Sequence, residues 1–225
     1  MQFKSDDVFI EKKCNSLIVT FSRPEKMNAI NLNMRDKIWE ALELVRVDQK
    51  INAIVFTSNI PGCFSAGADI NDFGSAPSIE ASRNSRLQRN LWKLLNNLDV
   101  PIISFVDGIA YGAGAEIAMA SDWIFATSNS MFALPEIKLG YMPAAGGSQL
   151  VLRKLPSSEA NKIVFHGSPI SAPRLYELGI VHKIIQSSEV NYLIDEWCNM
   201  LIDFEIEQLR KLKNKFLMIA NPDLK

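Results

Sequence analysis

The sequence contains little cysteine and little histidine: three cysteines and two histidines among 225 residues. Cys14, Cys63 and Cys198 are too few and too widely spaced for a disulfide framework or a CxxC metal motif. The histidines add no metal-ligand spacing to them. Disulfide-rich secreted scaffolds and zinc modules are therefore excluded. Because residues 1–10 lack the basic and apolar regions of a secretory signal, we expect a cytoplasmic protein.

Neither sign of charge dominates the chain. It carries 24 basic and 25 acidic side chains, for a net charge of −1, so it has no general field that would attract nucleic acid. A membrane span is also missing, because the longest apolar stretch, residues 101–120, is interrupted by Asp107, by glycines and by Glu116. We therefore expect no nucleic-acid partner and no membrane span.

What the sequence does have is enough apolar material for a large core, since 48% of its residues are hydrophobic. Hydrophobic periodicity predicts a hairpin over residues 8–13 and 16–22, strands over 51–57, 101–106, 123–126 and 180–185, and helices over 31–47, 79–98, 112–121, 157–166, 173–178 and 189–220. Such alternation is typical of parallel sheets with right-handed crossovers. The predicted fold class is α/β. Residues 74–78 are expected to form a loop beside a site.

Glu116 is the first candidate for chemistry. It lies within a run of alanine, isoleucine and methionine, on a helix that is apolar on nearly every face and is therefore expected to be buried. A carboxylate in that position must be paired, protonated or facing a cavity. A structural ion pair with a distant base is the alternative. No base is near in the sequence, so the pattern favours a functional role.

Glu136 is the second candidate, because it follows Pro135 at the end of an apolar segment, where a turn can present it to a pocket. Taken alone, it would be interpreted as a solvated loop residue. Two carboxylates in different environments can, however, divide the roles of acid and base. The loop around Gly67 and the helix start at residues 112–114 offer backbone N–H groups to an oxyanion, although both are also compatible with ordinary glycine turns.

Phosphate and dinucleotide motifs are incomplete. Gly62 and Gly67 have the spacing of a P-loop, but Ala68 and Asp69 stand where its lysine and hydroxyl residue belong. The glycines of residues 112–114 lack the third glycine of the dinucleotide fingerprint.

Ordered motifs then resemble the crotonase (enoyl-CoA hydratase/isomerase) superfamily over roughly residues 8–185. They occupy residues 22–30, 64–70, 108–122, 134–143, 146–149 and 179–181. The resemblance implies a crotonase-like spiral of stacked ββα units over residues 1–187. It also implies a C-terminal helical segment over 188–225, shortened because the chain stops before the family's usual last helices. A homotrimer or a dimer of trimers is the implied assembly.

The resemblance implies an acyl-CoA thioester as substrate, with no metal and no cofactor beyond the coenzyme A of that substrate. The family's catalytic carboxylates map onto Glu116 and Glu136, and its oxyanion donors onto the N–H groups of Ala68 and Ala113. Substrate-binding positions fall at Lys26, Ala29, Ala66, Asp69 and Ile70, with Tyr141 replacing a smaller residue at the acyl pocket.

Retention of both carboxylates favours an enoyl-CoA hydratase-like lyase that adds water to a 2-enoyl thioester. Related enolate chemistry, as in a double-bond isomerase or racemase, is the first alternative, and a non-catalytic acyl-CoA-binding protein is the second. Besides Tyr141, two positions depart from the family pattern: Ala113 and Ala144 stand where glycine is common. A methyl group at position 113 narrows the approach to the backbone donor.

Overall fold

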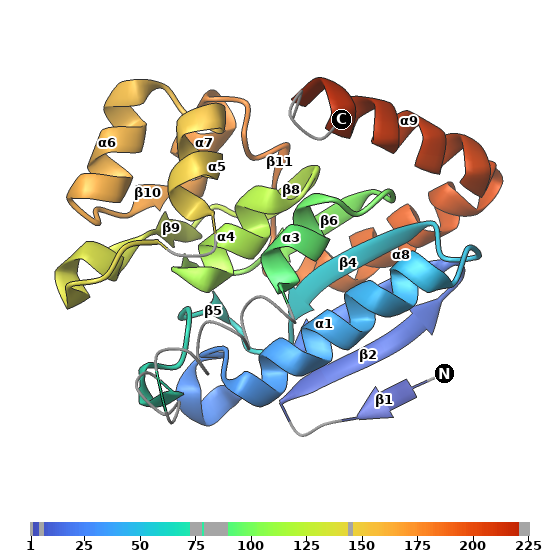
Figure 1. Cartoon of the computed structure of the whole chain (residues 1–225), viewed down its shortest axis with the longest axis horizontal. Helices are drawn as coiled ribbons and strands as arrows, with labels where there is room; N and C mark the ends of the chain where they lie inside the picture. The colour runs from blue at the N-terminus through green and yellow to red at the C-terminus, as the bar shows by residue number, and fades with distance from the viewer. Residues whose placement is uncertain (1, 5–6, 73–77, 79–89, 144–145, 221–225) are drawn as a thin grey trace.

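A sheet of seven strands runs through the molecule (Figure 1). The computed structural model describes residues 2–4, 7–72, 78, 90–143 and 146–220. The strand order is β1 (Gln2–Lys4), β2 (Val8–Lys13), β3 (Ser16–Phe21), β4 (Ala53–Ser58), β6 (Ile102–Val106), β8 (Trp123–Thr127) and β11 (Lys183–Ile185). The first three strands are antiparallel and the rest are parallel. The predicted hairpin is confirmed as β2 and β3.

A second, smaller sheet has the order β10 (Ile170–Ser171), β9 (Met131–Ala133), β7 (Ile109–Tyr111) and β5 (Cys63–Ser65). Successive turns of the chain place β4, β6 and β8 in the large sheet and β5, β7 and β9 in the small one. This repetition is the predicted spiral of ββα units, and the α/β class is confirmed. The strands of the small sheet have two or three residues, too few for the alternation that predicts a strand.

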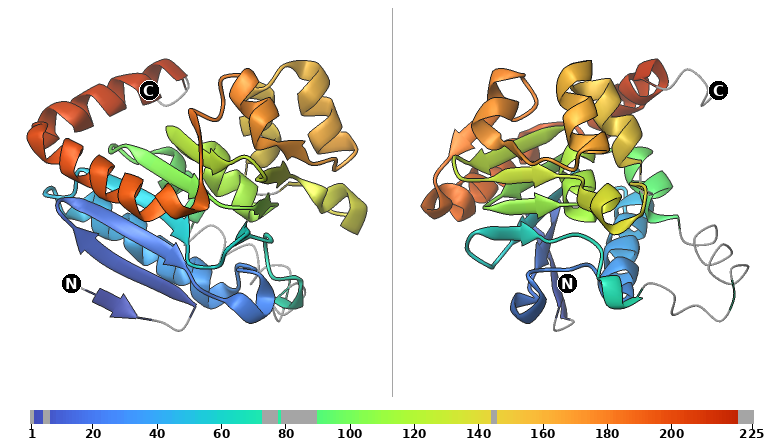
Figure 2. Two further views of the ribbon diagram at one scale, coloured as in Figure 1. Left: turned by 180° about the vertical axis from the view of Figure 1, so that it is seen from behind. Right: turned by 90° about the vertical axis from the view of Figure 1, so that its left-hand side faces the viewer.

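Helices cover both faces of the large sheet (Figure 2). They are α1 (Leu32–Val47), α3 (Leu91–Asn96), α4 (Ala113–Ala120), α5 (Gly147–Lys154), α6 (Ser157–Phe165), α7 (Ala172–Glu177), α8 (Val190–Met200) and α9 (Ile206–Ala220). Short 3-10 turns are η1 (Pro24–Lys26), η2 (Ile70–Asp72), η3 (Pro135–Leu139), η4 (Ser187–Glu189) and η5 (Leu201–Asp203). The sequence predicts α1, and the choice of cap that it leaves open between Asn31 and Asn33 falls on Asn31, whose side chain accepts a hydrogen bond from the N–H of Met34 at 2.7 Å.

Two predicted elements differ from the structure, and parts of others lie outside the residues that it describes. The helix predicted over residues 189–220 is wrong as one element, because η5 and an extended Phe204 separate α8 from α9. The strand predicted over 180–185 covers only β11, since the N–H groups of Ile180 and Val181 donate to the carbonyl of Leu175. Residues 79–89 of the predicted helix, residues 74–77 of the predicted loop, and Ala144 lie outside the described residues.

The large sheet separates two apolar cores. In β4, Ile54 and Phe56 pack into the larger core beneath α1, α3 and α4, whereas Val55 points to the smaller core beneath α8. A parallel strand buried on both faces is apolar along its whole length, which explains the continuous hydrophobic run in this segment. The cores hold the carboxyl ends of the strands, and so the start of α4, in fixed positions.

The C-terminal helix α9 is attached to the same body (Figure 1). Arg210 is buried, forms an ion pair with Asp99 and donates to the carbonyls of Val45 and Ile51 at 2.9 and 3.1 Å. Lys213 pairs with Asp122. The division into residues 1–187 and 188–225 stays a prediction. Within the described part of the chain, no helix combines the length and apolar character that crossing a membrane requires.

Candidate active site

Three segments that are distant in the sequence meet at the start of α4. Gly112 turns the chain from β7 into α4 with φ 47° and ψ −123°, a conformation that disfavours residues with a Cβ atom. A Cβ at this position would lie 3.0 Å from Glu136 Oε1 and 3.6 Å from the Cα of Gly67. The structure therefore places the glycine loop, the beginning of α4 and the turn that carries Glu136 against one another.

Residues 66–69, here called the donor loop, lie alongside residues 27–30. The N–H of Ala66 donates to the carbonyl of Met27 at 2.9 Å. Ile30 makes two backbone hydrogen bonds with this loop. Its N–H donates to the carbonyl of Gly67 at 2.7 Å, and its carbonyl accepts from the N–H of Asp69 at 3.0 Å. Within the residues that the structure describes, the N–H of Ala68 has no protein acceptor, which leaves it available to a ligand.

The N–H of Ala113, in the first turn of α4, likewise has no acceptor among the described residues. Helix N-termini carry unsatisfied N–H groups and a partial positive charge, so they bind anions and developing oxyanions. Because Gly67 lies against Gly112, the two predicted donors come from adjoining segments. Ala68 is exposed and Ala113 is nearly buried, at 8%.

Glu116 is 2% exposed and lies on the same first turn of α4. Its Oε1 accepts a hydrogen bond of 2.8 Å from the N–H of Gly147, the first residue of α5. The hydrogen bond places the Glu116 carboxyl group at the N-terminal end of α5, which carries the positive end of the helix dipole. A Cβ at Gly147 would lie only 2.6 Å from that oxygen, so this close approach depends on glycine.

Glu136 has a different environment on η3. Its Oε2 is buried and has no hydrogen-bond partner among the described residues. Burial raises the pKa of the Glu136 carboxyl above its ordinary value, because removal from water disfavours the charged form. The structure thus brings together two carboxyl groups of unlike environment: Glu116 accepts a hydrogen bond from the N–H of Gly147, and Glu136 has a raised pKa and one buried oxygen without a partner among the described residues.

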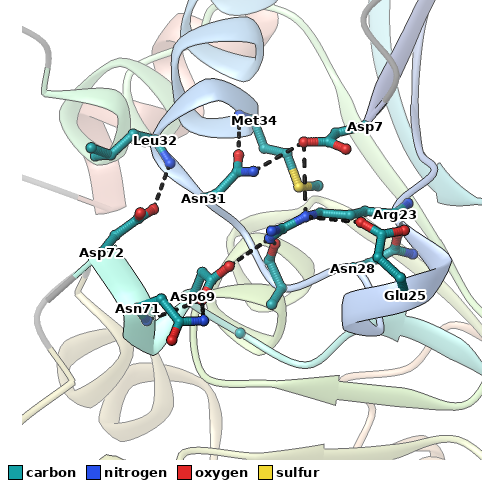
Figure 3. Close-up of polar contacts among 12 residues, drawn as sticks. Asp7, Arg23, Glu25, Asn28, Asn31, Leu32, Met34, Asp69, Asn71 and Asp72 are labelled. Atoms are coloured by element: carbon teal, nitrogen blue, oxygen red, sulfur yellow. Dashed lines mark hydrogen bonds and ion pairs between the residues drawn. The ribbon is translucent and has the colours of Figure 1, made fainter.

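The predicted substrate-binding residues differ in their exposure. Lys26, Ile70 and Tyr141 are exposed, and Ala29 and Ala66 are half-buried. Asp69 differs from the others, because it is 6% exposed and its Oδ2 lies 2.6 Å from Nη1 of Arg23 (Figure 3).

Sequence reasoning missed two residues beneath the donor loop. Asn28 is fully buried with φ 54°, and its side-chain amide donates to the carbonyl of Phe64 at 3.0 Å. Arg23 is the other, and its N–H donates to the side chain of Asn28 at 2.7 Å. Both residues lie in the first motif of the resemblance, residues 22–30. The motif indicates that a site is near, but it does not indicate which hydrogen bonds these residues form.

A family model described as enoyl-CoA hydratase/isomerase matches residues 11–224. The short-chain-enoyl-CoA hydratase of Clostridium acetobutylicum is 30% identical over 197 residues, which are 88% of this chain and 76% of that protein. The 2,3-dehydroadipyl-CoA hydratase of Escherichia coli is 34% identical over 181 residues, 80% of this chain and 70% of that protein.

Solved structures agree on the fold. An enoyl-CoA hydratase/isomerase from Pseudoalteromonas atlantica superimposes with a TM-score of 0.87 at 22% identity, covering 96% of this chain and 85% of that one. An enoyl-CoA hydratase subunit from Geobacillus kaustophilus gives a TM-score of 0.79 at 26% identity, covering 97% and 93%.

Proposed function

Because the chain belongs to the enoyl-CoA hydratase/isomerase family, we propose that it adds water across the double bond of a 2-enoyl-CoA thioester. The observation that carries this proposal is the unequal pair of carboxyl groups at the start of α4. Glu116 accepts from the N–H of Gly147, whereas Glu136 keeps a buried oxygen without a partner among the described residues. Hydration needs one group that takes a proton and one that gives a proton.

The thioester carbonyl accepts hydrogen bonds from the N–H groups of Ala68 and Ala113. When the water oxygen bonds to C3, negative charge moves onto the carbonyl oxygen, and the two donors stabilise the resulting enolate more than the ground state. Loss of one such donor typically costs about 2.7–4 kcal/mol of barrier, so we expect these two backbone groups to be a major source of rate.

Glu116 serves as the base and Glu136 as the acid in this proposal. The Glu116 carboxylate takes a proton from water while the water oxygen bonds to C3 and the C2–C3 π electrons move toward the carbonyl. The Glu136 carboxyl then gives its proton to C2. Transfer of a proton from Glu116 back to Glu136 through solvent restores both groups, and the sum is one water added per thioester.

The coenzyme A portion is proposed to lie along Lys26, Ala29, Ala66 and Ile70, where exposed and half-buried residues border the donor loop. Lys26 supplies positive charge for the phosphates. Tyr141, half-exposed after η3, is proposed to border the acyl chain. The reaction as written uses no cofactor other than the coenzyme A of the substrate.

A product survey tests the proposal. Purified protein is mixed with 2-enoyl-CoA thioesters of graded length, and products are followed by loss of the conjugated enoyl absorption and by the mass gain of one water. We expect hydroxyacyl-CoA from at least one length. Migration of the double bond without a hydroxyl product would favour isomerisation, and binding without turnover would favour a non-catalytic role; either result rejects hydration.

We further propose the trimer, or dimer of trimers, that the sequence resemblance implies. Its support is an exposed apolar set on α9, namely Leu212, Phe216, Met218 and Ile219, which are 55–80% exposed in the single chain. Apolar surface of this kind is typical of an interface between subunits. Sedimentation equilibrium should return a multiple of three chain masses, and a monomer at micromolar concentration would contradict the assembly.

A further inference from the structure

Asp69 and Arg23 form a clamp across the base of the donor loop (Figure 3). The guanidinium Nη1 of Arg23 lies 2.6 Å from Asp69 Oδ2 and donates to the carbonyl of Ala29 at 2.9 Å. The other carboxylate oxygen, Oδ1, accepts from the backbone N–H of Asn71 at 3.0 Å and from its side chain at 2.9 Å. Both oxygens of Asp69 are therefore occupied by the protein itself.

The clamp lies next to the peptide that would bind the substrate. Ile30 and Ala68 form an isolated bridge, and the residues that Arg23 joins, Ala29 and Asp69, flank that bridge on either side. Because a trans peptide is planar, the carbonyl of Gly67 and the N–H of Ala68 point in opposite directions. The carbonyl is fixed by the 2.7 Å bond from Ile30, so the Ala68 N–H is turned away from Ile30.

The pair is also shielded from water. The side chains of Arg23 and Asp69 are 13% and 6% exposed, so water competes poorly for their hydrogen bonds. Arg23 has further acidic neighbours on its other side, with Glu25 at 3.4 Å and Asp7 at 3.8 Å from Nε. Both of those contacts are at Nε and neither involves a residue of the donor loop, so Asp69 is the acidic residue that connects the guanidinium to the loop.

We propose that Arg23 and Asp69 are positioning residues, which hold the Ala68 N–H at the angle an oxyanion requires and do not themselves touch the substrate. This inference rests on the proposed oxyanion role of Ala68. It differs from the direct substrate contact that the family resemblance implies for Asp69. A loop freed from the clamp still binds the thioester, but it stabilises the enolate less, so the defect should appear in kcat more than in KM.

The test compares Asp69→Ala and the nearly isosteric Asp69→Asn with Glu25→Gln. Glu25 is exposed and contacts the same guanidinium, so its variant controls for loss of charge beside Arg23. Loss of an oxyanion donor costs about 10²- to 10³-fold in kcat, and we expect about 10- to 100-fold for Asp69→Ala because the donor is misaimed but present. Asp69→Asn keeps an acceptor for Arg23 and should recover most of the rate. Glu25→Gln should match the unsubstituted chain.

A spectroscopic readout separates positioning from simple loss of fold. Cinnamoyl-CoA, an enoyl thioester with a conjugated ring, absorbs at longer wavelength when its carbonyl is polarised by hydrogen bonds. At saturating protein, Asp69→Ala should bind it with a Kd within about threefold of the unsubstituted chain, since a threefold change is under 1 kcal/mol, yet give a smaller red shift. Thermal unfolding is measured in parallel, and Asp69→Asn supplies the folded variant if Asp69→Ala unfolds.

The outcomes are distinct. An unchanged red shift and kcat in folded Asp69→Ala would overturn the positioning role. A selective rise in Kd and KM with kcat unchanged would overturn it in favour of direct contact with coenzyme A. If the unsubstituted chain polarises cinnamoyl-CoA but hydrates no enoyl thioester, hydration fails while the positioning role stands. If the unsubstituted chain neither binds nor polarises the thioester, both the proposed function and this inference are rejected.

Discussion

The donor loop and the η3 turn border the same site and hold their carboxyl groups in opposite ways. Asp69, at the end of the donor loop, has both oxygens in hydrogen bonds, and Arg23 lowers its pKa below the ordinary value. Glu136, on η3, has a buried oxygen with no partner in the described part of the chain, and burial raises its pKa. A satisfied carboxylate fixes structure, and an unsatisfied one is free to exchange a proton.

The largest effect is expected from a change at Glu136, the carboxyl group whose buried oxygen has no partner among the described residues. Glu136→Gln keeps the shape of the side chain but removes its acidic proton, so we expect kcat to fall by about 10²- to 10⁴-fold with KM little changed. Steady-state hydration of the best enoyl-CoA is the measurement. Glu177→Gln, an exposed change on α7, is the matched control. A Glu136→Gln rate equal to that of the control would remove Glu136 from the mechanism.

A second prediction moves the carboxylate proposed as the base, Glu116, without altering its chemistry. Gly147→Ala introduces a Cβ that would lie 2.6 Å from Glu116 Oε1, and the buried side chain must shift. A displacement near 1 Å can cost about 10²-fold, so we expect kcat to fall by about 10- to 100-fold. Alanine at the start of a helix costs nothing in propensity, so thermal stability should change little. Activity and stability that decline together would indicate general damage instead.

The third prediction concerns Gly112, the turn residue before α4 that lies between Gly67 of the donor loop and Glu136 of η3. Gly112→Ala places a Cβ at φ 47° and ψ −123°, 3.0 Å from Glu136 Oε1, and should lower the free energy of unfolding by about 1–3 kcal/mol. Urea unfolding measures this loss. Gly179→Ala is the control, because Gly179 has φ +74° but open space around its Cα. Equal losses in the two variants would show that contact with Glu136 contributes nothing.

The smallest expected effect is a pH dependence of the free energy of unfolding that arises from Glu136. The folded-state pKa of Glu136 is raised, so between the unfolded and the folded value the folded chain binds more protons and stability falls as pH rises. Glu136→Gln removes that decline, and its stability relative to the unsubstituted chain should rise on going from about pH 4 to about pH 7. The gain should be slight, because Glu136 is half-exposed and solvent screens it.

Asp69 should show the opposite sign. Its folded-state pKa is lowered, so its contribution to stability is present above the unfolded value and is lost as pH falls through the folded value. Asp69→Asn should therefore be destabilised most near neutral pH, and the difference from the unsubstituted chain should shrink in acid. Urea unfolding of both variants across this range checks both signs, and parallel slopes for Asp69→Asn and Glu136→Gln would contradict the comparison.

The long elements could be predicted because their signals are local. Helix α1 shows its apolar face and its cap, Asn31, within one segment, and β4 is a continuous apolar run. The strands of the small sheet could not be predicted, since each has two or three residues and is defined by its neighbours. The break between α8 and α9 was missed because apolar spacing continues through residues 201–204 while the backbone turns.

The candidate site divides in the same way. Glu116 is conspicuous in the sequence as an acid among small apolar residues, and Glu136 as an acid after Pro135, so the sequence singles out both as candidates, although Glu136 alone would be interpreted as a solvated loop residue. The role of Asp69 in a clamp was not found. Its partner, Arg23, is 46 positions away, and nothing near either residue in the sequence indicates that their side chains meet.

By itself, the sequence determined the α/β class, because periodicity acts over a few neighbouring residues, and its ordered motifs implied the spiral through their resemblance to a known family. It also singled out Glu116 and Glu136 as candidates. Only the tertiary structure decided which carboxyl groups are satisfied. The N–H of Gly147 reaches Glu116 across 31 positions, Arg23 reaches Asp69 across 46, and Glu136 keeps one oxygen buried without a partner among the described residues. Hydrogen bonding and burial set the state of a carboxyl group, and both depend on which distant segments the fold brings together.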